Sequence, residues 1–146
     1  MKHITKYKLF ESHKEMIPLF HDIFQELKDD GFNVNIREAC ILRLDFSKAH
    51  VVSVNNSTFN LDLLTDQRLN VIEVLIGNKL NRFSIGDIIE VLKFAESYIK
   101  EELKYTIENI YIQCVPKYTY YKSLNCIPKD KSIDSISVYF KNESVI

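Results

Sequence analysis

The sequence predicts a single domain of the mixed α/β (α+β) class, with a mostly antiparallel central sheet flanked by helices. Short runs rich in branched apolar residues alternate with two segments of helical periodicity, which is typical of this class. The 146 residues suffice for one hydrophobic core, and 46% of them are apolar. No internal repeat, linker or low-complexity segment is present, so residues 1–146 are predicted to form one domain.

The first half of the chain is predicted to contain a helix between strands. A short strand over residues 4–10 comes first, and the segment from Ser12 to Glu15 has the form of a capping box. Helical spacing then relates six apolar residues, Met16, Leu19, Phe20, Ile23, Phe24 and Leu27. Gly31 stands where a glycine ends a helix. Strands over 41–44 and 51–54 follow, joined by a hairpin connection over 45–50, and residues 58–64 extend the second strand or form an irregular edge.

The second half is predicted to begin with a nearly all-apolar strand over 71–76, as expected for a central strand covered on both faces. An amphipathic helix beginning at Asp87 is the clearest element, with its apolar stripe formed by Ile88, Val91, Leu92, Ala95, Ile99 and Leu103. A strand over 107–115, a short helix over 117–124 and a last strand over 135–140 complete the predicted order β-α-β-β-β-α-β-α-β.

The composition argues against several classes of protein. The chain has 19 basic and 20 acidic residues, so no basic excess indicates nucleic-acid binding. Cys40, Cys114 and Cys126 form no CxxC pair, which favours reduced thiols in a cytoplasmic protein, and the last two are expected to be small buried residues. The four histidines show no metal-ligand spacing, and no long apolar run predicts export or membrane insertion. We therefore expect no metal, no nucleic acid and no membrane partner.

Two of the three glycines bracket a ten-residue stretch, from Gly77 to Gly86, between the apolar strand and the amphipathic helix. A strand, a tight polar loop and a helix together present backbone N–H groups and a helix N-terminus to an anion. The stretch therefore predicts a phosphate-binding loop. An ordinary strand-to-helix connection without a ligand is the alternative.

The element order and this loop resemble the GNAT family of N-acetyltransferases, over roughly residues 4–140 and most strongly over 71–140. In that family a loop of pattern Gln/Arg-x-x-Gly-x-Gly/Ala holds the pyrophosphate of acetyl-CoA on its backbone N–H groups. The matching positions are Asn81, Ser84 and Gly86, so Asn81 replaces the Gln or Arg and Ser84 replaces a glycine. The resemblance implies acetyl-CoA as co-substrate, with the backbone of Leu75 and Ile76 binding the thioester and pantetheine arm. The implied pyrophosphate loop comprises Asn81, Arg82, Phe83, Ser84, Ile85, Gly86 and Asp87.

A second motif resembles the same family. Many members carry a phrase like Phe-Tyr-x-x-x-Gly-Phe, which corresponds to residues 120–126 here, with Asn125 in place of Gly and Cys126 in place of Phe. The resemblance implies that Tyr121 protonates the departing CoA thiolate. A packing role for Tyr121 in a tyrosine-rich segment is the alternative, and Cys114 stands where the family often has an asparagine.

Glu73 is the one acidic residue inside the central apolar strand, which makes it a candidate general base. An ion pair with Arg43 or Arg68 is an equally supported alternative. Asp45, Asp62 and His50 are further candidates that the sequence does not rank.

The resemblance implies a small cytoplasmic acyltransferase that moves an acetyl group from acetyl-CoA to a primary amine of a small molecule or peptide, in a ternary complex. Homodimers are common in the family. Two other functions stay open: a GNAT-like acyl-CoA-binding or catalytically impaired regulatory module, and a non-enzymatic interaction protein such as an immunity protein or a phage-derived inhibitor.

Overall fold

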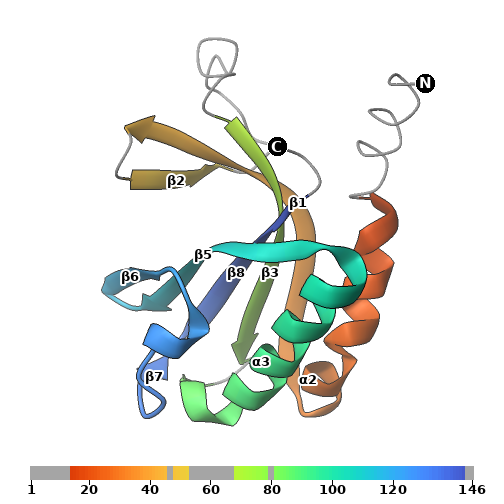
Figure 1. Ribbon diagram of the computed structural model, residues 1–146. Helices are drawn as coiled ribbons and strands as arrows, with labels where there is room; N and C mark the ends of the chain where they lie inside the picture. The colour runs from red at the N-terminus through yellow and green to blue at the C-terminus, as the bar shows by residue number, and fades with distance from the viewer. Residues whose placement is uncertain (1–13, 46–47, 53–67, 79–80, 144–146) are drawn as a thin grey trace, which may run out of the picture.

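A six-stranded antiparallel sheet with helices on one side forms the framework of the protein, as Figure 1 shows. The computed structural model describes residues 14–45, 48–52, 68–78 and 81–143. The predicted strand over 4–10, the capping residue Ser12 and the segment 58–64 lie outside these ranges. The mixed class and the mostly antiparallel sheet flanked by helices are confirmed.

The strand order is β2-β1-β3-β8-β5-β6, and every neighbouring pair is antiparallel. The bounds of the six strands are β1 (Phe32–Asp45), β2 (Lys48–Val52), β3 (Arg68–Asn78), β5 (Tyr105–Cys114), β6 (Lys117–Tyr121) and β8 (Ser135–Asn142). A separate pair joins β4 (Phe83–Ser84) to β7 (Ser132–Ile133). The strands predicted over 71–76, 107–115 and 135–140 correspond to β3, β5 and β8.

The first helix follows the predicted apolar spacing. Residues 14–23 are helical, a turn at Phe24 interrupts the helix, and α2 (Gln25–Asp29) continues it. Gly31 has a φ of +96°, the left-handed conformation that glycine adopts without a steric penalty at a helix end. This confirms the predicted end of the helix.

The strand β1 begins nine residues earlier than the predicted start at residue 41. Val34 and Ile36 are largely buried, while Asn33, Asn35 and Arg37 are exposed. This period-two alternation is the pattern of a half-buried strand, so the sequence carries a local signal for the first half of β1 that the predicted start at residue 41 left out. The connection to β2 is also shorter than predicted, since Asp45 already pairs with Lys48.

The prediction of a short helix over 117–124 is wrong. Residues Lys117–Tyr121 form β6, which pairs with β5 so that Tyr111 lies opposite Tyr120 and Ile110 opposite Tyr121. Only Leu124–Cys126 forms a helical turn, of the 3₁₀ type. Aromatic residues favour strands, and pairing with β5 decides the structure here.

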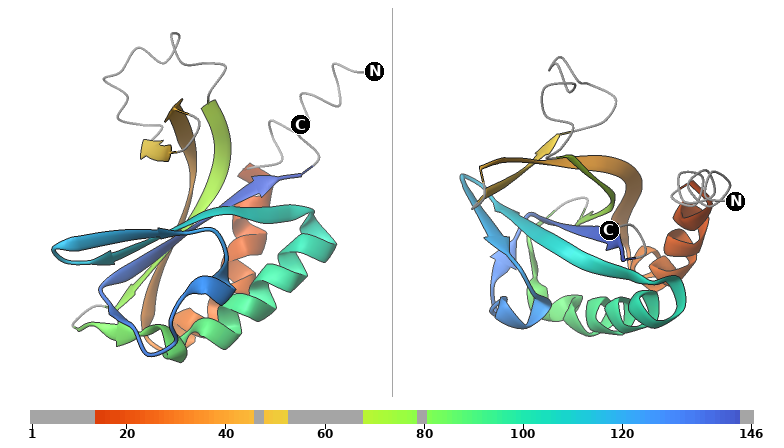
Figure 2. Two further views of the ribbon diagram at one scale, coloured as in Figure 1. Left: turned by 60° about the vertical axis from the view of Figure 1, so that its left-hand side comes forward. Right: turned by 45° about the horizontal axis from the view of Figure 1, so that its top comes forward.

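The long predicted helix is confirmed. A 3₁₀ turn (Ile85–Asp87) leads into α3 (Ile89–Tyr98), and a π-helical turn (Ile99–Leu103) ends at Lys104, which has a φ of +61°. Ile88, Leu92, Ala95 and Ile99 of the predicted stripe are buried. Figure 2 shows α3 beside the helix that precedes β1, both lying along one side of the sheet.

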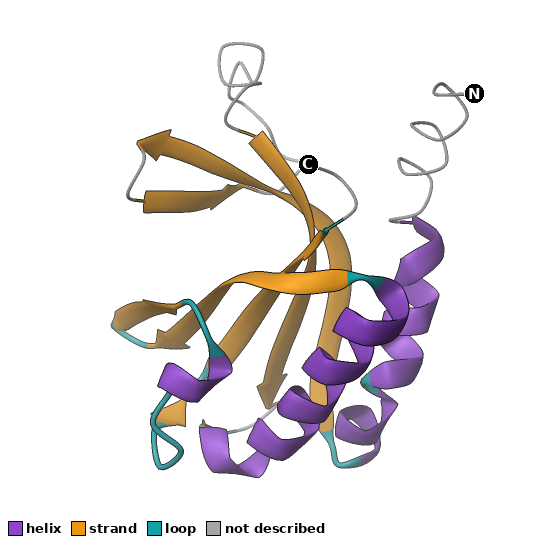
Figure 3. Cartoon of the chain, viewed as in Figure 1, coloured by secondary structure: helices purple, strands orange, loops and turns teal. Residues whose placement is uncertain are grey.

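The two faces of the sheet differ in what covers them (Figure 3). On the helix-covered face, Val34, Ile36, Ile72, Val74, Ile76, Ile110, Ile112, Ile136, Val138 and Phe140 pack against Phe20, Phe24, Leu27, Ile88 and Leu92 of the helices. On the opposite face, Ala39, Ile41, Val71 and Tyr139 form a smaller cluster, flanked by Leu69 and Tyr111, that contains no residue of a described helix. We call this second surface the helix-free face.

Candidate functional site

Within the loop predicted to bind pyrophosphate, the N–H groups of Ser84, Ile85 and Gly86 donate to other groups of the protein. Ser84 N–H donates to Asp87 Oδ2 at 3.2 Å, and the Ser84 side chain accepts in return, which completes a capping box. Ile85 N–H donates to the Lys131 carbonyl at 2.9 Å, and Gly86 N–H to the Lys129 carbonyl at 2.7 Å. A pyrophosphate needs free, convergent N–H groups. These residues do not fit one in this conformation.

Gly86 has a packing reason for being glycine. A Cβ on this residue would lie 3.1 Å from the Lys129 carbonyl oxygen, and Ser84 Oγ also donates to that oxygen at 3.0 Å. The turn is therefore a joint between the start of α3 and the segment that leads into β7. Phe83 and Ile85 anchor it, since both are buried and Phe83 packs edge-on against Phe32 at 5.2 Å.

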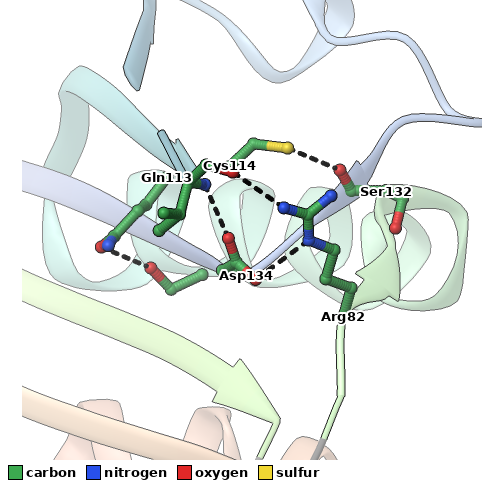
Figure 4. A network of polar contacts seen from close by, with 7 residues as sticks. Arg82, Gln113, Cys114, Ser132 and Asp134 are labelled. Carbon is green, nitrogen blue, oxygen red and sulfur yellow. Dashed lines mark hydrogen bonds and ion pairs between the residues drawn. The ribbon is translucent and has the colours of Figure 1, made fainter. Parts of the chain in front are cut away.

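Arg82, expected to supply charge to a phosphate, is used inside the protein. Its Nε contacts Asp134 Oδ1 at 3.2 Å, and its Nη2 donates to the Val115 carbonyl at 2.8 Å. Asp134 Oδ2 accepts from Val115 N–H at 2.7 Å, so both side chains hold the β5–β6 turn (Figure 4). Asn81 is exposed beside them.

The backbone of Leu75 and Ile76 lies in the interior of the sheet. Leu75 pairs with Asn35 of β1 and Ser137 of β8, and Ile76 pairs with Val34 and Ile136. A strand paired on both sides has its N–H and C=O groups committed to the two ladders. The backbone role that the resemblance implies for these residues has no free groups to use.

The two predicted catalytic residues lie on opposite faces of the sheet. Tyr121 pairs with Ile110, which pairs with Val138, which pairs with Val74, and paired residues share a face. Glu73 is one residue from Val74, so it lies on the helix-free face. Tyr121 is half-buried against the helix-covered core, where its hydroxyl accepts from Lys131 Nζ at 3.3 Å.

Tyr121 does lie near the predicted loop. Lys131 contacts the Tyr121 hydroxyl through its side chain and accepts from Ile85 N–H through its carbonyl. The structure thus brings Tyr121 and the loop together through one residue. It does not bring Glu73 to either of them.

Glu73 is the centre of a buried polar group on the helix-free face. Its Oε1 accepts from Arg37 Nε at 2.7 Å, and the phenol of Tyr139, opposite it on β8, donates to it. The side chain of Glu73 is 5% exposed and that of Arg37 is 55% exposed. The ion-pair alternative is therefore confirmed in kind, but the partner is Arg37 instead of Arg43 or Arg68.

Burial, and after it the Glu73 carboxylate, raises the pKa of Tyr139 far above its usual range. An opposing but smaller effect comes from a hydrogen bond with Ser137, which lowers this pKa. Tyr139 therefore remains a neutral donor, so this group has the character of a structural hydrogen-bond network.

Three tyrosines from β5 and β6 lie together on the helix-free face, and the sequence reasoning assigned them no role. Tyr111 of β5 lies between Tyr118 and Tyr120 of β6, with ring centroids 5.6 Å and 5.0 Å away. Tyr118 is 54% exposed and Tyr120 is 51% exposed. We call these three residues the tyrosine cluster. Alternation on β6, read as a strand, would have placed Tyr118 and Tyr120 together on one face.

Thiols and other ligating groups form no further site in the part of the chain that is described. Cys40 is buried and Cys114 partly buried, whereas Cys126 is exposed, which corrects the expectation of a buried residue there. Within 14–45, 48–52, 68–78 and 81–143, no group of three or more His, Cys, Asp or Glu residues could hold a metal ion. No helix among these residues has the length and apolar character needed to cross a membrane.

Comparisons with known proteins found no match. The chain matches no protein-family model, no curated protein and no solved structure.

Proposed function

We propose that the protein is a non-enzymatic binding module that recognises a partner protein through its helix-free face. Tyr118 and Tyr120 would form the centre of the contact. The observation that carries this proposal is the tyrosine cluster, in which two large side chains are about half exposed while Tyr111 holds them in place. Tyrosine is enriched among the residues that dominate binding energy in protein interfaces.

The cluster has the physical properties of a preformed contact surface. The rings of Tyr111 and Tyr118 are nearly parallel, with 6° between their planes, so stacking restricts both side chains before a partner arrives. An ordered side chain loses less conformational entropy on binding than a free one. Each ring also offers apolar area together with a hydroxyl that can donate or accept.

The N-acetyltransferase hypothesis stays a prediction, and the geometry of the loop weighs against it. The N–H groups of Ser84, Ile85 and Gly86 bond within the protein, and Glu73 lies on the other face of the sheet from Tyr121. Acetyl-CoA would have to displace the Lys129 and Lys131 carbonyls before its pyrophosphate met these groups. We therefore expect no change in melting temperature at millimolar acetyl-CoA. A ligand at 100 Kd adds about 2.7 kcal/mol, so clear stabilisation would restore the enzyme hypothesis.

Crosslinked capture of partners tests the proposed binding face. The bait is the full chain, as wild type, as a Tyr118→Ser/Tyr120→Ser variant, and as a matched Phe94→Ser/Tyr98→Ser variant. Phe94 and Tyr98 are the exposed aromatic pair of α3, 73% and 47% exposed, and lie away from the helix-free face.

We expect the Tyr118/Tyr120 variant to lose partners that both the wild type and the α3 variant capture. Partners that only the α3 variant loses would show that the binding surface is on that helix, and this would contradict the proposal. Circular dichroism and thermal melting of all three baits show that a loss reflects contact and not unfolding.

A further inference from the structure

The tyrosine cluster borders an open strand edge. β6 is the last strand of the sheet order, so one side of its backbone pairs with β5 and the other side faces outward. Among the described residues, no strand or loop pairs with that outer side. A row of unpaired N–H and C=O groups is a template for an added strand.

The edge is held in shape before binding. Asp134 N–H donates to the Gln113 carbonyl at 2.8 Å, and the Asp134 carboxylate accepts from Val115 N–H at the turn. Arg82 contributes a third contact through the Val115 carbonyl, and Figure 4 shows the same network from close by. A partner strand would therefore meet an ordered edge, which lowers the entropic cost of pairing.

The charge around β6 is mainly positive. Lys117 and Lys122 are exposed at its two ends, and the ammonium group of Lys131 lies 5.6 Å from the centre of the Tyr121 ring. Residues 116–132 contain four lysines and a single acidic residue, Asp130. The whole chain has a formal charge of −1, so this strand is a local basic surface on an otherwise balanced protein. Such a surface favours an acidic partner and speeds its association.

We infer that the partner supplies an extended, acidic strand that pairs with the outer edge of β6. This inference rests on the proposed function, because the same strand would place alternate side chains over Tyr118 and Tyr120. Backbone pairing gives affinity that does not depend on sequence, the tyrosines contact the apolar side chains of the peptide, and Lys117 and Lys122 select for Asp and Glu.

A displayed library of eight-residue peptides, selected on the wild-type chain of 146 residues, tests the inference. We expect the selected peptides to be rich in Asp, Glu and β-branched residues. A selection that yields no peptide, or yields basic peptides, overturns the inference. Single-stranded dT20 serves as a polyanion control, and binding of dT20 that displaces the best peptide would also overturn it, in favour of nucleic acid.

Two further measurements on the best peptide separate this inference from the proposed function. Lys117→Glu with Lys122→Glu should weaken binding about tenfold or more, whereas Lys14→Glu with Lys100→Glu, on exposed helical positions, should leave it unchanged. Hydrogen exchange by NMR should show new protection of outward-facing amides within residues 117–121. Tyr118→Ser/Tyr120→Ser could abolish binding while neither lysine double variant changes the affinity and no amide of residues 117–121 gains protection. In that case the inference of an acidic strand is wrong and the proposed binding face is retained. If binding survives all variants, both proposals fail.

Discussion

At the scale of single residues, Glu73 shows how burial sets the free-energy cost of removing the partner of a charged group. Its side chain is almost wholly buried, whereas the side chain of Arg37, which contacts it, is about half exposed. We expect Arg37→Gln to lower the free energy of unfolding by about 2 kcal/mol, because it leaves a buried carboxylate without its cation.

Glu73→Gln should cost less, about 1 kcal/mol, because water can solvate the released Arg37 and the amide oxygen can still accept from Tyr139. Urea unfolding of the two variants measures the difference. A larger loss for Glu73→Gln than for Arg37→Gln would show that burial does not set the cost here.

Tyr139 gives the protein a defined response to alkaline pH. Because burial raises its pKa in the folded state, both folded and unfolded states hold the phenolic proton below the ordinary tyrosine pKa of about 10. Above that pH the unfolded state loses the proton first, so the free energy of unfolding falls as pH rises, by at most about 1.4 kcal/mol per pH unit for this group.

Tyr139→Phe should remove this component of the pH dependence. Urea unfolding of wild type and variant between pH 8 and 11 should give stability curves that converge as pH rises, since the stabilising phenolic proton is present only in wild type. Curves that run parallel over this range would show that Tyr139 titrates normally in the folded protein.

At the scale of elements, two glycines that look alike in the sequence have different roles. A Cβ on Gly86 would press on the Lys129 carbonyl, which two hydrogen bonds hold in place, whereas a Cβ on Gly77 would make only ordinary contacts at 3.7 and 3.9 Å. We expect Gly86→Ala to destabilise the protein by about 1–3 kcal/mol.

Gly77→Ala is the matched control for this prediction. It should be neutral or should stabilise the protein by up to about 1 kcal/mol, because alanine costs less backbone entropy within a strand. Chemical unfolding of both variants makes the comparison. Equal effects would mean that the joint between α3 and the segment before β7 adapts to the added methyl group.

At the scale of the whole molecule, the sequence predicted those elements whose local pattern and tertiary environment agree. The stripe of α3 and the apolar run of β3 each fit one period, and the structure places both as expected. The first half of β1 was missed although Val34 and Ile36 alternate with polar neighbours, which is a local strand signal. The strand β6 was missed because its structure is decided by pairing with β5, which the local sequence does not report.

The contacts at the candidate site could not be predicted from the sequence for a related reason. Gly86, Ser84 and Arg82 have the residue types of an anion loop, but they contact Lys129 and Asp134, which lie 43 to 52 residues later in the chain. Arg82 and Asp134, which contact each other beside the loop, also hold the turn that leads into β6, the strand of Tyr118 and Tyr120. The residue types suggested a phosphate ligand, and only the tertiary contacts show that these loop groups bond within the protein.

The open edge of β6 also determines how the molecule behaves toward its own copies. Two such edges could pair to form a continuous sheet, but Lys117 and Lys122 at the ends of the strand would bring like charges together. We expect Lys117→Gln with Lys122→Gln to increase self-association, seen as a concentration-dependent rise in sedimentation coefficient at low ionic strength. Lys14→Gln with Lys100→Gln, which removes the same charge from the helices, should sediment as wild type does. Equal association of both variants would assign the effect to net charge, and the absence of association in either would show that β6 does not accept a strand from a second copy.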